Sequence, residues 1–216
     1  MKFITDPEEI EKKSFRIISE RLSQMQFEPQ NVNVIKRVIH ATADFDYAKK
    51  LVFSHDVVRL TKEILKTGAQ IVTDTQMAKS GINKKAALQL GCALHCFIDE
   101  PEIAETAQAK GITRAWAAVD KAAETLKNPV VFIVGNAPTA LIRLHELIMC
   151  NAFLPAMIIA VPVGFVNVVE SKELILTLQI PHIVAKGQKG GSNVAAAICN
   201  ALLYETTERE LAKHGE

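Results

Sequence analysis

Arg37 and His40 stand three residues apart in a stretch whose apolar spacing predicts a helix. Residues at that spacing lie on one side of a helix, so both side chains can reach the same ligand. Histidine exchanges protons near neutral pH, and arginine is a permanent cation that suits carboxylates. Ser14, on the helix expected before this one, can reach the same place. We treat the three residues as a candidate site, although spacing alone also allows an ordinary surface His beside an Arg.

A second candidate is the segment Gly187-Gln188-Lys189-Gly190-Gly191-Ser192-Asn193, called the glycine loop below, which leads into the last long helix. Free amides at a helix N-terminus, together with a lysine, can bind a carboxylate or a phosphate. The same glycines also suit a strand-to-helix turn that binds nothing. The residues alone leave both interpretations open.

Common cofactor and metal motifs are missing or incomplete. The spacing GxxxxGK[ST] does not occur, and no GxGxxG follows an apolar run, so nucleotide cofactors have little support. His145 begins a sequence like the HExxH zinc motif, but Met149 stands where the second histidine belongs. His95, between Cys92 and Cys96, lies in an expected strand whose successive residues face opposite ways. We therefore predict that the protein uses no metal and no cofactor.

Helices and short apolar runs alternate along the chain from Ser54 onward. Continuous apolar runs between helices indicate a parallel sheet that is covered on both faces. Ligands bind such sheets at the carboxyl ends of the strands, which is where the glycine loop begins. The segment Asp44-Phe45-Asp46 is expected to form a solvated turn before a short helix. The expected strands are 70–73, 93–98, 130–134, 157–161 and 183–185, and the expected helices are 7–25, one after Pro29, 55–67, 103–109, 113–126, 139–150, 168–178 and 192–210.

These elements predict one α/β domain spanning residues 1–216, with a mainly parallel five-stranded sheet and helices on both faces. Residues 1–50 form a helical N-terminal extension packed on the α/β core of residues 51–216. No Pro/Gly/Ser-rich linker separates the two parts, and no internal repeat is present.

The composition of the chain argues against several classes of protein. The 216 residues are 49% hydrophobic and 23% charged, with a formal net charge of +1. A neutral chain without a Lys/Arg cluster lacks the electrostatic field of a nucleic-acid binder. No apolar stretch is long enough to span a membrane, and the N-terminus turns acidic where a signal peptide would be apolar. Four cysteines are too few for a disulfide scaffold, so we expect them to be reduced and mostly buried in a cytoplasmic protein without nucleic-acid or membrane partners.

Six segments, taken together, resemble the precorrin isomerase family, the methylmutases of cobalamin biosynthesis that act on precorrin-8 or its cobalt form. They occur in the family's order and cover essentially the whole chain. The segments are RVIHATADFD at 37–46, IVTDTQMA at 71–78, GNAPTAL at 135–141, PVGFV at 162–166, ESK at 170–172 and GGS at 190–192.

The resemblance implies an isomerase that moves a methyl group from C-11 to C-12 of the corrin ring, giving hydrogenobyrinate or cobyrinate. It implies that Ser14 and Arg37 bind the substrate and that His40 is the catalytic acid/base. It also implies a homodimer whose active site lies near the subunit contact.

Further contacts to the carboxylates of the corrinoid tetrapyrrole are expected from two places. Arg114 lies in a Thr-Arg segment that is similar to one in the family. Gln188 stands where relatives often carry arginine, which removes one expected anion contact from the glycine loop. The remaining substrate-binding candidates in that loop are Lys189, Gly190, Gly191 and Ser192.

A methyl shift within one molecule needs no hydride or phosphate donor, which agrees with the missing nucleotide motifs. On a metal-free macrocycle, His40 can protonate a ring nitrogen and recover the proton after migration. If cobalt fills the ring, its nitrogens are coordinated, and His40 must act elsewhere on the conjugated ring or as a ligand near the metal. The segments ADFDYA and VTDTQMAK resemble the cobalt-dependent branch more closely.

Two other classes of protein compete with the isomerase. A corrinoid-binding or delivery protein would use Arg37 and the glycine loop but would not need a titratable His40. A flavodoxin-like or nucleotide-binding enzyme would need glycines after the first expected strand, where Asp74-Thr75-Gln76 stands instead. We rank the second class last.

Overall fold

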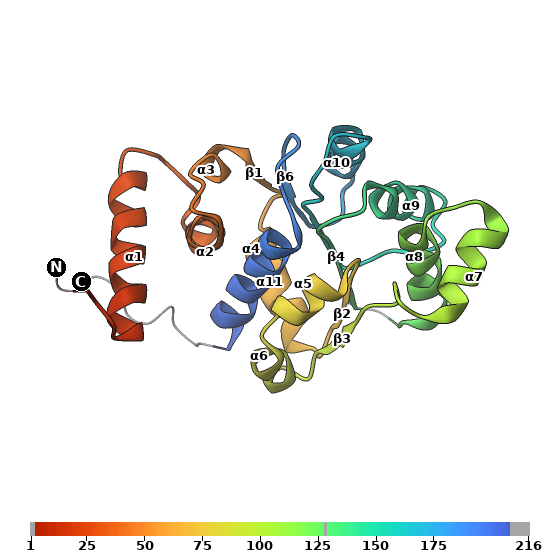
Figure 1. Ribbon diagram of the computed structural model, residues 1–216, viewed down its shortest axis with the longest axis horizontal. Coiled ribbons are helices and arrows are strands. Elements are labelled where there is room, and N and C mark those ends of the chain that lie inside the picture. Colours follow the sequence, from red (N-terminus) through yellow and green to blue (C-terminus); the bar gives the residue numbers. More distant parts are fainter. Residues whose placement is uncertain (1–2, 128, 208–216) are drawn as a thin grey trace.

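One sheet runs through the middle of the computed structural model, which describes residues 3–127 and 129–207 (Figure 1). Within those residues the sheet has six strands in the order β1-β6-β5-β4-β2-β3. The strands are β1 (Leu51–Phe53), β2 (Gln70–Thr73), β3 (Ala93–His95), β4 (Val130–Val134), β5 (Met157–Ala160) and β6 (His182–Ala185).

The five expected parallel strands are confirmed, because β3, β2, β4, β5 and β6 pair in parallel. The predicted strand count was wrong: β1 adds an antiparallel edge strand, in register Leu51↔Ala185 and Phe53↔Ile183. Three residues are too few to show a strand period in the sequence, and the pairing partner lies far along the chain. β3 is also shorter than expected, ending at His95.

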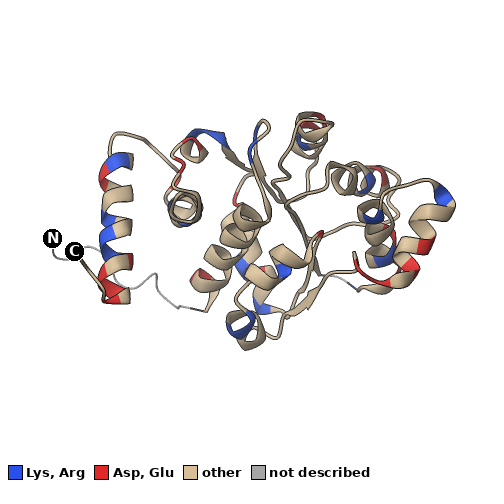
Figure 2. Cartoon of the chain, viewed as in Figure 1, with Lys and Arg blue, Asp and Glu red and all other residues tan. Residues whose placement is uncertain are grey.

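Two apolar cores lie on the two faces of the sheet. Along β4, Val131 and Ile133 point into one core, whereas Phe132 and Val134 point into the other. This alternation is the period of two that a strand imposes on its side chains. The strands carry no Lys, Arg, Asp or Glu, as Figure 2 shows, which suits a sheet buried on both faces.

The helices accordingly form two layers. One layer packs on the first core and contains α1 (Pro7–Leu22), α2 (Val32–Thr42), α3 (Tyr47–Lys50), α4 (Val57–Lys66), α5 (Gln76–Gly81), α6 (Lys84–Gln89) and α11 (Ser192–Thr206). The other layer contains α7 (Pro101–Lys110), α8 (Arg114–Thr125), α9 (Pro138–Met149) and α10 (Val168–Leu176). A short 3₁₀ turn, η1 (Pro29–Asn31), precedes α2.

The helix after the glycine loop, α11, lies at the centre of the first layer and packs against α2, α4 and α5. Most of its residues are buried, and Glu205 is its single charged residue. The sequence predicts that this helix reaches residue 210. Residues 208–210 lie outside the described residues. Because α2 packs along α11, the element that carries Arg37 and His40 is fixed to the element that follows the glycine loop.

The N-terminal helix begins as its sequence predicts. Asp6 accepts a hydrogen bond from the amide of Glu9 at 2.8 Å, and Pro7 occupies the first turn. The helix ends at Leu22 rather than near residue 25. It contacts α2 and stands at one end of the molecule (Figure 1).

Helices α5 and α6 were not predicted. Each has six residues, too few for the apolar repeat over several turns by which a helix is recognised. Their caps are nevertheless visible in the sequence, since Thr75 and Asn83 accept hydrogen bonds from the amides of Ala78 and Ala86.

Candidate active site

Ser14 and His40 meet where α1 packs on α2. The hydroxyl Oγ of Ser14 lies 2.9 Å from Nδ1 of His40. The imidazole also stacks on the ring of Phe15, with centroids 5.0 Å apart and an interplanar angle of 13°. Among the described residues, no hydrogen bond reaches the other ring nitrogen, Nε2. The ring is therefore held on one edge and one face, and Nε2 is the nitrogen available to a ligand.

His40 lies in the exposed last turn of α2, which ends at Ala43 in a left-handed conformation with φ of 54°. Partial burial of the ring lowers the pKa of His40 below its usual value near 6.5, and the charge of Arg37 lowers it further. The carboxylate of Glu11 opposes this shift in pKa. In the free protein a smaller fraction of the imidazole is consequently protonated at neutral pH than in an unperturbed histidine.

Arg37 is largely buried, with 15% of its side chain exposed. Its guanidinium forms an ion pair with Glu11 at 3.0 Å and lies 4.8 Å from the ring centre of Phe15 and 5.4 Å from that of Tyr204. The sequence spacing places Arg37 and His40 on neighbouring parts of α2 but gives no sign of the ion pair with Glu11. A substrate carboxylate that binds Arg37 must share the guanidinium with Glu11.

The glycine loop packs tightly on the end of β5. A Cβ atom on Gly190 would lie 2.1 Å from the carbonyl oxygen of Val161, so a larger residue cannot occupy this position without moving the backbone. The amide of Gly191 donates a hydrogen bond to the same carbonyl at 2.9 Å, with a φ of 134° that favours glycine. Close packing therefore explains these glycines whether or not the loop binds an anion.

Lys189 connects the glycine loop to the turn after α2. Its Nζ lies 2.6 Å from a carboxylate oxygen of Asp44 and 2.8 Å from one of Asp46. The Asp44-Phe45-Asp46 turn was predicted to be solvated, and Lys189 was predicted to contact an anion. In the structure the two aspartates of that turn are the ion-pair partners of Lys189. The loop and the end of the His40 helix are neighbours in space.

Ser192 and Asp74 organise the carboxyl ends of the strands. The hydroxyls of Ser192 and Thr75 are 2.8 Å apart. Asp74, 5% exposed, accepts hydrogen bonds of 2.8 Å from the amides of Gly135, Asn136 and Ala137. Burial raises the pKa of Asp74, and the three amides counteract that rise. The one sequence signal for this role is the position of Asp74 directly after β2, and Asp74 was not among the predicted site residues.

Arg114 stands apart from the other candidates. It is exposed at the start of α8, in the layer on the other face of the sheet. The hydroxyls of Thr113 and Thr139, 2.7 Å apart, join the beginnings of α8 and α9. Within one chain, the structure brings together Ser14, Arg37, His40 and the glycine loop, but not Arg114.

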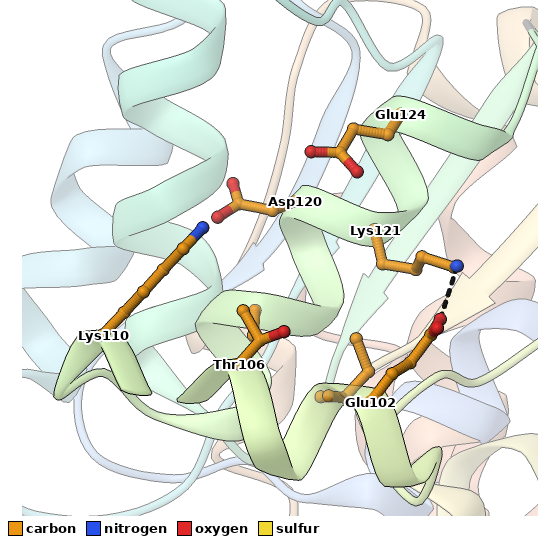
Figure 3. Close-up of a pocket in the computed structure, with 8 residues that line it drawn as sticks. Glu102, Thr106, Lys110, Asp120, Lys121 and Glu124 are labelled. Atoms are coloured by element: carbon orange, nitrogen blue, oxygen red, sulfur yellow. Dashed lines mark ion pairs between the residues drawn. The ribbon is translucent and has the colours of Figure 1, made fainter. Parts of the chain in front are cut away.

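A pocket of about 230 Å³ lies between α7 and α8 and does not include any candidate site residue (Figure 3). Ion pairs involve several of its lining residues: Glu102 pairs with Lys121, and Asp120 pairs with Arg143 of α9 at 2.6 Å. Figure 3 shows Lys110 extending toward Asp120. In Figure 1, α7 and α8 are at the opposite end of the molecule from α1 and α2. The pocket belongs to a different part of the surface.

The cysteines are free thiols, and the expectation that they are mostly buried is confirmed for Cys92, Cys96 and Cys199, while Cys150 is exposed. In residues 3–127 and 129–207, no three His, Cys, Asp or Glu side chains group as metal ligands would. None of the helices described there is long and apolar enough to cross a membrane.

The family model described as precorrin-8X methylmutase matches residues 9–205 of the chain. The chain belongs to the precorrin-8X methylmutase family. This family of isomerases in cobalamin biosynthesis is the one that the six sequence segments resemble, so that prediction is confirmed.

The chain is similar in sequence to named methylmutases along almost its whole length. It is 45% identical to a cobalt-precorrin-8 methylmutase of Salmonella typhimurium, with 96% of this chain and 100% of the relative covered. It is 42% identical to a cobalt-precorrin-8 methylmutase of Leptospira interrogans, with 93% and 94% covered. The crystal structure of a precorrin-8x methyl mutase from Thermus thermophilus has a TM-score of 0.84 and 36% identity, with 93% and 98% covered.

Proposed function

We propose that this methylmutase-family chain converts cobalt-precorrin-8 into cobyrinate by moving a methyl group from C-11 to C-12 of the corrin ring. The observation that carries the proposal is the Ser14–His40 contact of 2.9 Å beside the glycine loop, in a chain of this family. The cobalt form is favoured because the 45% and 42% identical relatives both bear that name.

His40 is the proposed acid/base. The reaction is an isomerisation, so the proton that His40 gives to the substrate must return to it when migration is complete. Ser14 holds Nδ1 and leaves Nε2 for this exchange. With cobalt in the ring the four nitrogens are coordinated, so the proton is exchanged at the conjugated carbon framework.

Arg37, Arg114 and the backbone of the glycine loop are the proposed contacts to the substrate's carboxylates. Arginine suits a carboxylate because its planar guanidinium donates two parallel hydrogen bonds. The amide of Gly191 is taken by the carbonyl oxygen of Val161, so the amides proposed for a carboxylate are those of Gly190 and Ser192. They stand at the beginning of α11, where the helix dipole favours negative charge. A macrocycle edged with carboxylates needs several such contacts around its rim.

We also propose that the chain works as a homodimer, with the active site near the subunit contact. Arg114 lies in the other helix layer, so a second copy can supply it to a site built around His40. Phe165 and Val166 leave 86% and 76% of their surface exposed, which a subunit contact would cover. Light scattering at micromolar concentration is expected to give the mass of a dimer, and a fully active monomer would contradict this.

The free thiols favour a reducing, cytoplasmic location.

The substrate form is tested by incubating the purified chain with cobalt-precorrin-8 and, separately, with metal-free precorrin-8. We expect turnover of the cobalt form to be faster, detected as a product of unchanged mass with a changed absorption spectrum. Faster turnover of the metal-free form would contradict the proposed substrate. Stoichiometric binding of both forms without an isomerised product would instead identify a corrinoid carrier.

A further inference from the structure

Lys172, on α10, is a buried lysine whose ammonium contacts the backbone of the glycine loop. It is 1% exposed, and no carboxylate in the described part of the chain forms an ion pair with it. Its Nζ donates hydrogen bonds to the carbonyl oxygens of Gly187 at 2.6 Å and Lys189 at 2.9 Å. Burial and the charge of Lys50 lower the pKa of Lys172 to about 8, because the charged ammonium is less stable in the protein interior than in water. The backbone of the glycine loop is thus fixed from the protein interior.

The same loop is fixed from its outer side by Lys189. Its ammonium bridges the carboxylates of Asp44 and Asp46. The turn that presents them is itself ordered, because Asp44 also accepts a hydrogen bond from the amide of Asp46 at 2.9 Å. The ammonium lowers the pKa of both carboxyls, so they are charged across the neutral range. A carboxylate of the substrate would meet two like charges at Lys189.

Asp44 lies only one turn beyond His40. Ala43 ends α2 in a left-handed conformation and donates a hydrogen bond to Ile39 at 2.7 Å, which fixes the direction in which the chain leaves the helix. A connected series of contacts therefore runs from Lys172 through the loop backbone and Lys189 to the end of the His40 helix.

We infer that Lys172 and Lys189 are positioning residues: together they hold the glycine loop against the turn that follows His40. The inference rests on the proposed function, in which the loop amides and His40 act on the same macrocycle. Fixing the distance between them holds the reacting carbon in place relative to the proton donor. Lys189 then acts through Asp44 and Asp46 rather than as a direct contact to the substrate.

Turnover of the three variants Lys189→Met, Asp44→Asn/Asp46→Asn and their combination tests this assignment. We expect Lys189→Met to lower kcat by about tenfold to 100-fold, the usual effect of a misplaced reacting group, with KM little changed. Because both sides act through one contact, the combined variant should be no slower than Lys189→Met. Lys189→Arg should recover most of kcat. Lys49→Met is the control, since it removes an exposed lysine from nearby α3 that has no ion pair among the described residues.

Hydrogen exchange of the unliganded protein supplies a readout that needs no turnover. Exchange of peptides covering 186–191 and 43–46 should rise in Lys172→Met and in Lys189→Met, and should stay unchanged over 70–73. Lys189 is exposed, so its variant remains informative if Lys172→Met folds poorly.

The outcomes separate the inference from the proposed function. Unchanged exchange in the lysine variants overturns the inference even if the wild-type protein is active. The inference is also overturned if the losses of kcat in Lys189→Met and in Asp44→Asn/Asp46→Asn multiply in the combined variant and Lys189→Met raises KM. That result would make Lys189 a substrate contact. A wild-type protein that isomerises neither substrate form overturns the proposed function, whatever the exchange data show.

Discussion

The hydroxyl of Ser14 and Nδ1 of His40 are 2.9 Å apart, although the residues belong to different helices and are 26 positions apart in the sequence. This contact depends on how α1 packs against α2. The face of α1 that carries Phe15 is buried, and the ring of Phe15 supports the imidazole from one side. The position of the N-terminal helix therefore determines the orientation of the proposed acid/base.

Ser14→Ala tests whether this contact orients the imidazole. Without the hydroxyl, the ring can rotate, and we expect kcat to fall by about tenfold while the fold is retained. Ser23→Ala is a matched control, because the hydroxyl of Ser23 donates to the carbonyl of Glu20 at the end of its own helix. Equal turnover in both variants would show that the Ser14 contact does not matter for catalysis.

The pH dependence of kcat/KM reports the protonation of the free enzyme. The pKa of His40 is lowered, chiefly by burial. An acid step needs the protonated ring, so kcat/KM should fall as the pH rises through a midpoint below about 6.5. The midpoint should vanish in His40→Asn. If the same midpoint persists in that variant, another group is titrating.

Arg37→Ala should destabilise the protein, because the guanidinium lies between Phe15 and Tyr204 and pairs with Glu11. We expect the free energy of unfolding to fall by about 1–3 kcal/mol. Arg37→Lys should recover only part of this, since it keeps the charge but loses the planar group. Urea denaturation measures the loss. Unchanged midpoints in both variants would contradict the packing role.

Asp74→Asn tests the buried carboxylate that holds the 135–137 turn. The substitution replaces one acceptor oxygen by a donor that faces backbone amides, so we expect stability to fall by about 2–3 kcal/mol. Asp99→Asn, at an exposed position after β3, should have little effect. If the two variants unfold at the same urea concentration, the amide contacts are worth less than their geometry indicates.

Much of the fold could be predicted because parallel strands buried on both faces leave continuous apolar runs, as in Val130–Val134. β1 could not be predicted, since its strand character comes from pairing with β6. α5 and α6 were not predicted because their apolar pattern is too short, even though their capping residues can be recognised in the sequence.

The site was predictable to the extent that it depends on local spacing or on the family's segments. Arg37 and His40 share a helix, Ser14 was placed on the helix before it, and the resemblance then gave the three residues their roles. The contacts that hold the glycine loop were not predictable, because Lys189 and Asp44 are 145 positions apart. Lys172 was noted only as the last residue of the ESK segment, and its burial comes from tertiary packing.

The most direct test of the account is the rate of methyl migration in wild type, His40→Ala and His40→Asn with cobalt-precorrin-8. Binding, followed by the absorption spectrum of the complex, should be nearly equal in all three, because the exposed imidazole contributes little to the core. Migration should slow by about 10²–10⁴ in His40→Ala, the usual contribution of a positioned proton donor. His40→Asn, which keeps a hydrogen-bond donor but cannot titrate, should be nearly as slow. Wild-type rates in both variants would contradict proton transfer by His40.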